Sequence, residues 1–442
     1  MADILFINAN VAVEPYPVYP IGMAVASRAL EEHGHHVVQY DLLQQERSLD
    51  KLITTLHNLS PDYVCMSLRN IDNVDYFTSH REWYLDGYRR LIHAIRSHLP
   101  VPIICGGPGF SVMPQTILQY IGADYGIRGE AEEELPRLIC ALENRNAPPS
   151  PAVIEAAPLP PSRQMRPRFI PQLVNYYIEQ GGIIGLPVKR GCPYQCAYCT
   201  YPIIEGKKFR QRTYADIISD IRYLKYECGI QQIFFTDSVF NDPLGEYLHF
   251  ARTLAEAQLD IQWGAFFSPR TLHPDALEIL KESGLFAIEL GTDAASDTTL
   301  AGMNKGFTWE QVCRFQEEAD KLQLPVAHYV IFGGPDETPD TVKEGIDNLS
   351  HFRNAVVFAF TGVRILPGTK IHQRAVAENI IHAEHNLLHP VYYISPHTPV
   401  EWLNETLTNA FRGNRMRIFP PEKGREMTDV MKRFGYKGLL WD

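Results

Sequence analysis

Three cysteines within eight residues constrain this chain more than any other feature of its sequence. Cys192, Cys196 and Cys199 form a C-x3-C-x2-C motif, whereas the other five cysteines are scattered along the chain. Clustered thiols in a chain without a disulfide framework indicate a metal site. Three thiolates on one loop can bind three irons of a [4Fe–4S] cluster, which normally takes four ligands. One iron would then be left open for another ligand.

A zinc site in a structural protein is the alternative for these thiols. Structural zinc sites usually need four ligands, often from two C-x2-C pairs. The chain has no second pair, and the next cysteine, Cys228, falls inside a helical pattern. We therefore expect iron rather than zinc at the cysteine motif.

Charge and hydropathy limit the partners of this chain. Its 442 residues include 41 Lys and Arg against 52 Asp and Glu, which gives a net charge of −11 and argues against a broad nucleic-acid surface. No apolar stretch approaches the ~20 residues of a membrane span. The start of the chain also lacks the basic region of a signal peptide. We therefore expect a cytoplasmic protein without a membrane span.

Residues 1–145 alternate β-rich runs with helical patterns, which predicts an α/β domain. Five strands are expected in a flavodoxin-like, doubly wound parallel sheet, whose ligands sit beyond the carboxyl ends of the strands. These strands are expected at residues 3–10, 36–42, 62–68, 101–105 and 124–128. A helix is expected over residues 22–33.

Prolines and a second βα alternation divide the rest of the chain. The proline density of residues 146–172 predicts an interdomain linker without a helix or a central strand. Residues 173–375 predict a partial (β/α)6 barrel with its active face at the strand C-termini. Residues 376–442 form a short extension with one expected helix, at residues 400–412. The barrel strands are expected at residues 183–189, 232–237, 261–267, 286–291, 326–332 and 356–365.

The cysteine motif and the domain order resemble a known family, the radical S-adenosylmethionine (SAM) enzymes that carry an N-terminal cobalamin-binding domain. Tyr198, an aromatic residue directly before the third cysteine, is typical of that family. The resemblance covers residues 1 to about 375. It implies a [4Fe–4S] cluster, SAM and cobalamin as cofactors. It also implies that SAM chelates the open iron and is cleaved to a 5′-deoxyadenosyl radical.

The resemblance further implies cofactor contacts at the ends of successive barrel strands. The implied residues are Asp237 and Ser238 at the second strand, Glu289 and Asp293 at the fourth, Gly333 and Gly334 at the fifth, and Arg364 at the sixth. Three alternatives stay open. Asp237 could cap the following helix, Glu289 could belong to a buried ion pair, and Gly333 with Gly334 could form only a turn.

The first domain resembles cobalamin-binding domains around Gly106 and Gly107, where the backbone can approach a nucleotide tail closely. The D-x-H-x-x-G motif that supplies an axial histidine in many such domains is absent. We therefore expect Arg69 or Asn70, which follow the third strand, to face the lower side of the cobalt without strong ligation. Two alternatives are that Arg69 pairs with Asp72 or Asp75, and that the domain has lost cobalamin.

Together these features predict a cobalamin-dependent radical SAM methyltransferase that acts on an unactivated carbon of a small-molecule or lipid-like substrate. A flavodoxin or ferredoxin is expected to supply electrons. One alternative is a radical SAM enzyme of the same architecture that catalyses a rearrangement, a cyclisation or the transfer of another SAM fragment. Another is a corrinoid-binding or iron–sulfur sensor without catalysis. No catalytic residue follows from the sequence alone.

Overall fold

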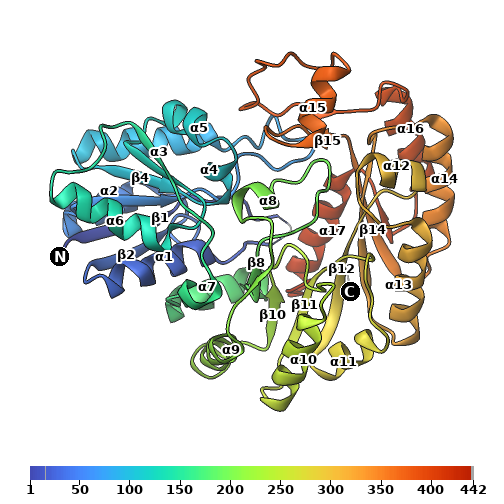
Figure 1. The fold of residues 1–442 in the computed structure, drawn as a ribbon, viewed down its shortest axis with the longest axis horizontal. Helices are drawn as coiled ribbons and strands as arrows, with labels where there is room; N and C mark the ends of the chain where they lie inside the picture. The colour runs from blue at the N-terminus through green and yellow to red at the C-terminus, as the bar shows by residue number, and fades with distance from the viewer. Residues whose placement is uncertain (15, 440–442) are drawn as a thin grey trace.

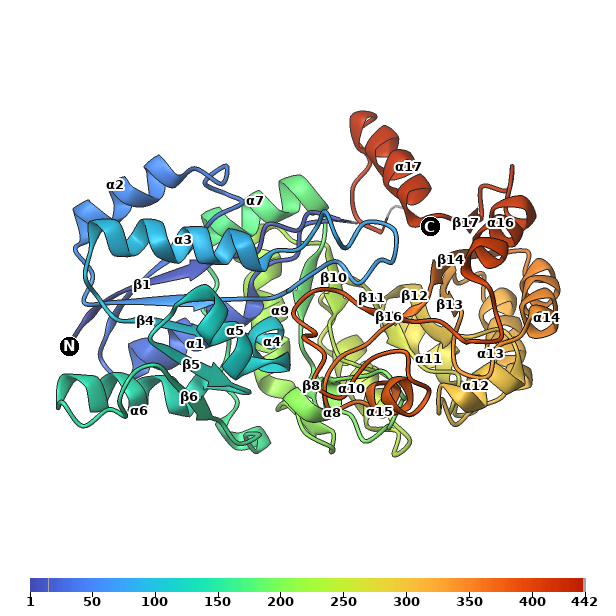
Figure 2. The same ribbon diagram turned by 90° about the horizontal axis from the view of Figure 1, so that it is seen from above.

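Two α/β units lie side by side in the computed structural model, which describes residues 1–14 and 16–439. The N-terminal unit, blue to teal, is on the left of Figure 1, and the barrel unit, green to orange, is on the right. The C-terminal extension, in red and dark orange, packs along the barrel unit and reaches back toward the first unit (Figures 1 and 2).

The N-terminal sheet has six parallel strands in the order β2-β1-β3-β4-β5-β6. Its strands are β1 Asp3–Asn8, β2 His36–Asp41, β3 Tyr63–Ser67, β4 Ile103–Gly106, β5 Tyr125–Arg128 and β6 Ala152–Glu155. The first five confirm the flavodoxin-like order. Nearly all residues of β1, β3 and β4 are buried, as expected for a parallel sheet covered on both faces.

Helices cover both faces of this sheet. They are α1 Ile21–Glu32, α2 Leu49–Leu59, α3 Leu85–His98, α4 Pro108–Val112, α5 Pro114–Ile121 and α6 Ala131–Glu143. Side chains along β1 alternate between the two faces of the sheet. Ile4 and Phe6 pack in the hydrophobic cluster with α1 and α6, whereas Leu5 and Ile7 pack in the cluster with α2, α3 and α5. The helix predicted over residues 22–33 is confirmed as α1.

The segment predicted as an interdomain linker without a helix or a central strand carries short elements. It contains β6 and the short 3-10 helix Pro161–Arg163, and its end begins α7, Pro171–Gly181. The segment has no central strand, as predicted, but it is not free of helix, because proline is tolerated in the first turn of a helix. Strand β6 lies at the edge of the sheet, and Pro171 occupies the first turn of α7, where a backbone N–H has no helical partner.

The barrel sheet has seven parallel strands in the order β17-β14-β13-β12-β11-β10-β7. They are β7 Ile184–Leu186, β10 Gln232–Phe235, β11 Gln262–Phe267, β12 Leu285–Asp293, β13 Val326–Phe332, β14 Ala355–Thr361 and β17 Arg417–Ile418. All six predicted strands are present. The sixth stops at Thr361, because Gly362 has a φ of +74° and turns the chain into a short strand, β15 Val363–Arg364.

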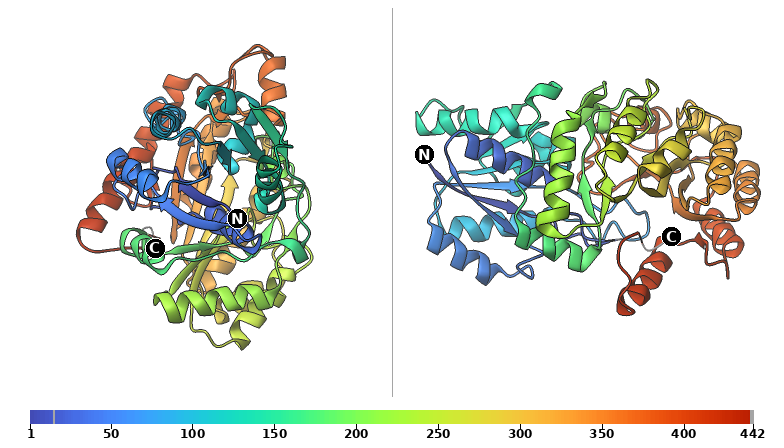
Figure 3. Two further views of the ribbon diagram at one scale, coloured as in Figure 1. Left: turned by 90° about the vertical axis from the view of Figure 1, so that its left-hand side faces the viewer. Right: turned by 90° about the horizontal axis from the view of Figure 1, so that it is seen from below.

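Helices follow the barrel strands and cover their outer face (Figures 1 and 3). They are α9 Tyr214–Cys228, α10 Glu246–Glu256, α11 Ala276–Glu282, α12 Asp297–Gly302, α13 Trp309–Lys321 and α14 Pro339–Ser350. The short helix α8 Tyr201–Ile204 instead lies next to α4 of the N-terminal unit. A two-stranded antiparallel ribbon, β8 Lys189–Arg190 with β9 Arg210–Gln211, encloses the segment that carries the three cysteines.

The C-terminal extension has more structure than predicted. It contains β16 Tyr392–Tyr393, α16 Val400–Ala410 and α17 Pro421–Arg433, and it follows α15 Lys370–Ala377. Only α16 was predicted, because the polar sequence of α17 gives a weak signal. Helix α17 buries none of its residues and lies apart from the other helices in Figure 2. No helix within residues 1–14 and 16–439 is long and apolar enough to cross a membrane.

Candidate functional site

The loop that carries the three cysteines is held from both sides by backbone hydrogen bonds. Gly191, with a φ of +83°, starts this loop, and a Cβ there would lie 2.2 Å from the Lys208 carbonyl oxygen. The Cys192 N–H donates to the Gly206 carbonyl at 3.0 Å, and the Ala197 N–H donates to the Met303 carbonyl at 2.8 Å. The loop is therefore fixed to its own ribbon and to the end of α12.

The three thiols on this loop are free and lie close enough to influence one another electrostatically. Burial raises the pKa of the Cys192 thiol and raises that of Cys199 to about 12. Bound metal would offset that cost by stabilising the thiolates. Among the described residues, no three metal-ligating side chains converge as a single ion requires. The three thiols lie on one loop, and three thiolates on one loop can bind three irons of a [4Fe–4S] cluster.

Tyr198 and Asp293, both predicted from the resemblance, meet beside the cysteine loop. The Tyr198 hydroxyl donates to the Asp293 carboxylate, which also pairs with the buried Lys305 ammonium. The charge of Lys305 lowers the pKa of Cys199 against the larger effect of burial. Sequence reasoning missed Lys305. Its position three residues after Gly302, the last residue of α12, only weakly indicates a site residue.

Asp237 and Ser238 fix the end of β10 next to the cysteine loop. One Asp237 oxygen accepts the N–H groups of Val188 at 2.8 Å and Lys189 at 3.1 Å. Its other oxygen is buried and has no hydrogen-bond partner among the described residues. Burial raises the pKa of Asp237 to about 6. The Ser238 hydroxyl donates to the Gly191 carbonyl at 3.2 Å.

The helix-cap alternative for Asp237 is wrong. The next helix, α10, begins at Glu246, and Gly245 occupies its N-cap position. The unpartnered Asp237 oxygen is thus a buried polar atom that a bound cation or N–H group could satisfy.

Gly333 and Gly334 form a tight turn after β13. Gly333 has a φ of +85°, and its N–H donates to the buried Glu337 carboxylate. A Cβ on Gly334 would lie 2.7 Å from the Met303 side chain. Burial raises the pKa of Glu337 to about 7. Sequence reasoning missed Glu337, which stabilises this turn from four residues beyond Gly333.

Arg364 forms a buried ion pair between the two units. Its guanidinium contacts the Asp72 carboxylate at 3.0 Å, and both side chains are 2 % exposed. It also donates to the carbonyls of Ile365 at 2.7 Å and Leu387 at 2.9 Å. The structure thus engages Arg364 in packing contacts rather than leaving it for a cofactor. The alternative that Arg69 pairs with Asp72 is wrong, because Arg364 takes that position.

An interdomain cavity of about 380 Å³ lies at the carboxyl ends of the N-terminal strands. Arg69, Gly106 and Gly107 line one side of it, as predicted, and Arg190 and Tyr201, which flank the cysteine loop, line another. Gly107 has a φ of +100°, and a Cβ there would lie 2.7 Å from the Leu68 carbonyl oxygen. The glycine edge lets the backbone closely approach a molecule held between the two units, at the carboxyl ends of the strands where ligands of such folds bind.

A second cavity of about 730 Å³, which we name the α17 cavity, lies under helix α17. Asn70 and Glu289, both predicted site residues, line it, and the Tyr329 hydroxyl hydrogen-bonds Glu289. Tyr16 lines both this cavity and the interdomain cavity. The two predicted neighbours Arg69 and Asn70 therefore face different cavities.

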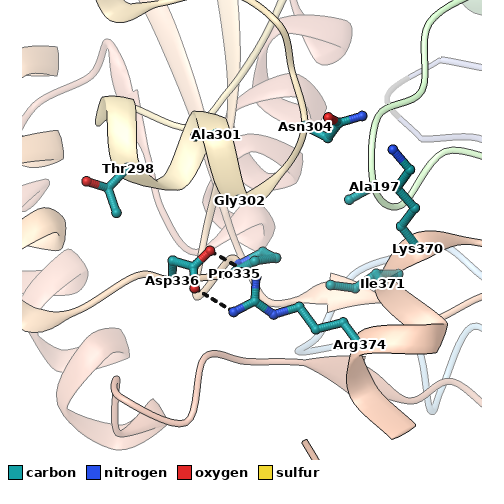
Figure 4. Close-up of a pocket in the computed structure, with 10 residues that line it drawn as sticks. All are labelled: Ala197, Thr298, Ala301, Gly302, Asn304, Pro335, Asp336, Lys370, Ile371 and Arg374. Carbon is teal, nitrogen blue, oxygen red and sulfur yellow. Dashed lines mark hydrogen bonds and ion pairs between the residues drawn. The ribbon is translucent and has the colours of Figure 1, made fainter. Parts of the chain in front are cut away.

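A hollow of about 530 Å³ lies on the outside of the cysteine loop (Figure 4). Ala197, between the second and third cysteines, lines it together with Lys370 and Arg374 of α15. The Arg374 guanidinium is held by the two Asp336 carboxylate oxygens at 2.5 and 2.9 Å. The cysteine loop thus comes close to the molecular surface here.

Two family models match this chain, one for each unit. Residues 7–139 match the B12 binding domain, and residues 186–349 match the radical SAM superfamily. The first match runs from the end of β1 through β5 and most of α6. The second begins at the end of β7 and includes the three cysteines.

Curated relatives share most of their length with this chain. An uncharacterized methyltransferase of Pyrococcus horikoshii is 26 % identical and covers 82 % of this chain and 79 % of the relative. Tryptophan 2-C-methyltransferase of Streptomyces laurentii is 24 % identical over 82 % of this chain and 73 % of its own. Hopanoid C-2 methylase of Rhodopseudomonas palustris is also 24 % identical, over 77 % of this chain and 63 % of its own.

Solved structures share the whole fold. The radical S-adenosylmethionine methyltransferase TsrM from Kitasatospora setae, with tryptophan substrate and a SAM analogue, superimposes with a TM-score of 0.87 at 21 % identity. The match covers 100 % of this chain and 97 % of TsrM. OxsB, a cobalamin-dependent S-adenosylmethionine radical enzyme, gives a TM-score of 0.75 at 15 % identity over 98 % of this chain and 72 % of its own. At these identities the likeness establishes the fold.

Proposed function

The chain belongs to the radical SAM enzymes that carry a B12-binding domain, and from that premise we propose that it is a methyltransferase acting on an unactivated carbon of a small molecule. The relatives whose names state an activity include methyltransferases for tryptophan and hopanoids. Their substrates differ widely, so the family alone does not define the substrate of this chain. The cofactors of this family are a [4Fe–4S] cluster, SAM and cobalamin.

One observation carries the proposal. The interdomain cavity is bounded by the glycine edge of the B12-binding unit and by residues that flank the cysteine loop, and it shares Tyr16 with the α17 cavity. Sites for a corrinoid, for a cluster with SAM, and for a substrate are therefore adjacent. Methyl transfer through cobalamin needs this adjacency, whereas a radical rearrangement of one substrate does not.

The residues divide the work as follows. Cys192, Cys196 and Cys199 would hold the cluster, and Asp237, which has an unpartnered oxygen beside the same loop, would hold SAM. Arg69, in the interdomain cavity, would contact the corrinoid without ligating the metal strongly, because it lacks an imidazole. When bound, the cluster and SAM supply a carbon radical, and cobalamin supplies the methyl group.

We further propose that a flavodoxin or ferredoxin supplies the electrons and that the enzyme works in the cytoplasm. The hollow outside Ala197 brings the cysteine loop near the surface, which gives a donor a short approach to the cluster (Figure 4). All eight cysteines are free, as expected for a reducing compartment.

Anaerobic reconstitution tests the proposal without knowledge of the substrate. The protein is purified with iron, sulfide and hydroxocobalamin, and iron and corrinoid are then quantified on the same sample. Addition of SAM and a strong reductant is expected to give methylcobalamin with an equal amount of S-adenosylhomocysteine. About four irons per chain without bound corrinoid would overturn the methyltransferase assignment and leave another radical SAM reaction.

A further inference from the structure

The α17 cavity has a floor of aromatic rings. Tyr329 on β13 and Phe358 on β14 stack with ring centroids 5.3 Å apart and planes 13° apart, and Phe360 stacks on Tyr329 at 6.4 Å. All three rings are only half-buried and line the cavity, while Val330 and Ala359, which alternate with them, are buried on the other face of the sheet. Such a floor favours a flat, apolar molecule.

The roof of the cavity is adaptable. Met427 and Met431 of α17 line the cavity from the helix, and Met416, whose carbonyl accepts the Val357 N–H, lines it from the edge of the sheet. Methionine side chains are flexible and polarizable, and they fill irregular gaps against aromatic bodies. Met416 and Met427 are each 39 % exposed, so these side chains present apolar surface that a bound molecule would cover.

The rim of the cavity carries one carboxylate with unused bonding capacity. Glu14 lines the cavity, and one of its oxygens is buried without a hydrogen-bond partner among the described residues. Two of the three arginines that line the cavity have other contacts, because Arg425 pairs with Glu82 at 2.5 Å and Arg47 donates to the Val11 carbonyl at 3.0 Å. The third, Arg415, is exposed to solvent.

The surroundings of Glu14 also favour a cationic partner. Burial raises the pKa of Glu14, and this effect exceeds the opposing charge of Lys432. Asp429 and Glu82 raise the pKa further, and Arg425 lowers it. An ammonium group at the buried oxygen would stabilise the charged form of the Glu14 carboxylate. It would also donate a charge-assisted hydrogen bond to that oxygen.

We propose that the α17 cavity binds a flat, largely aromatic or polycyclic molecule whose single ammonium group pairs with Glu14. This inference rests on the proposed function, because it treats the cavity as the substrate site of the methyltransferase. The proposal disfavours neutral lipids and carboxylic acids without an amine as substrates, because neither would donate a hydrogen bond from an ammonium group to the Glu14 oxygen.

Matched probes of one shape test the proposal. The anaerobically reconstituted holoenzyme is titrated calorimetrically with 2-(1-naphthyl)ethylamine, with the neutral 2-(1-naphthyl)ethanol and with the anionic 3-(1-naphthyl)propanoate. The amine is expected to bind about tenfold more tightly than the alcohol, the factor that one charge-assisted hydrogen bond supplies. The carboxylate is expected to bind most weakly.

Two carboxylate variants assign the charge preference. In Glu14→Gln the amine is expected to lose its tenfold advantage and bind like the alcohol, which should bind as before. Asp429→Asn removes an equal charge near Glu14 from the exposed side of α17, outside the cavity. It is expected to keep the preference for the amine. Equal loss in both variants would show general electrostatic attraction and overturn the role of Glu14.

A third variant tests the aromatic floor. Phe358→Ala removes one ring of the stacked pair and is expected to weaken the amine and the alcohol by the same factor, about tenfold. Equal binding of all three probes in the unaltered enzyme would overturn the inference. Corrinoid content and methylcobalamin formation by that unaltered enzyme are measured in parallel, and their failure would overturn the proposed function instead.

Discussion

The cysteine loop and the α17 cavity lie in one molecule but are built in opposite ways. The loop is anchored by backbone hydrogen bonds to Gly206 and Met303 and by the buried group of Tyr198, Asp293 and Lys305. The cavity is closed by a helix that buries none of its residues. One ion pair, between side chains 27 % and 30 % exposed, ties Arg425 of that helix to Glu82.

This difference matches two different tasks, the binding of the cofactors and the binding of the substrate. A cluster and its SAM ligand are the same in every radical SAM enzyme, so their site can be rigid and costly to disturb. The substrate differs among relatives that act on tryptophan or on hopanoids. A helix that buries none of its residues and is held by a partly buried ion pair can be adapted to another substrate with little loss of stability.

The largest expected effect comes from the rigid side. Cys196→Ala removes one of the three cluster ligands and is expected to reduce bound iron to a small fraction of the unaltered protein's, with loss of SAM cleavage. Iron, sulfide and 5′-deoxyadenosine are measured on anaerobically reconstituted samples. Cys228→Ala is the control, because Cys228 lies at the end of α9 and should leave the iron content unchanged. Retention of iron by Cys196→Ala would contradict the assigned ligand set.

The buried ion pair between the two units gives the next largest effect. Asp72→Ala leaves the Arg364 guanidinium buried without its carboxylate and is expected to destabilise the protein by about 3–5 kcal/mol. Urea denaturation under anaerobic conditions measures the loss. Glu310→Ala breaks a pair whose side chains are 67 % and 81 % exposed, and should cost less than about 0.5 kcal/mol. Similar losses in both variants would show that burial of the pair is unimportant.

This ion pair also shows where sequence reasoning stopped. The strand order, the cysteine loop and the glycine edge were predictable, because each depends on local pattern or on a motif. Arg364 was assigned to a cofactor because it ends a barrel strand, but its partner Asp72 comes from the other unit, 292 positions away in sequence. Nothing local in the sequence predicts such a contact. Glu337 was missed for a related reason, since its role depends on the turn that it stabilises.

The buried carboxyl group of Glu337 makes the free energy of unfolding depend on pH. Its pKa is about 7 in the folded protein and 4.5 as the ordinary value, so the folded state holds more protons between these values. Stability should therefore fall as pH rises through this window, by up to about 3 kcal/mol in total. Unfolding free energies at pH 5 and pH 8 measure the loss. In Glu337→Gln the dependence should be reduced by that amount, and an unchanged dependence would contradict the assignment to this group.

The smallest effect on stability is expected on the adjustable side. Arg425→Ala breaks the partly exposed ion pair between α17 and Glu82 and should change the unfolding free energy by less than about 1 kcal/mol. Hydrogen exchange should nevertheless become faster along α17 and stay unchanged at the cysteine loop, because opening of the roof does not disturb the barrel. The exposed Arg433 on the same helix gives the control variant, Arg433→Ala.

The same variant decides whether the roof restrains the substrate. If α17 holds the bound molecule, naphthylethylamine should leave Arg425→Ala several-fold faster than it leaves Arg433→Ala, with a smaller change in its association rate. Stopped-flow displacement measures both rates. Faster exchange without faster dissociation would mean that the aromatic floor and Glu14 bind the ligand alone, and that α17 only covers it. The contrast between a rigid cluster site and an adjustable substrate site would then rest on the floor of the cavity rather than on its roof.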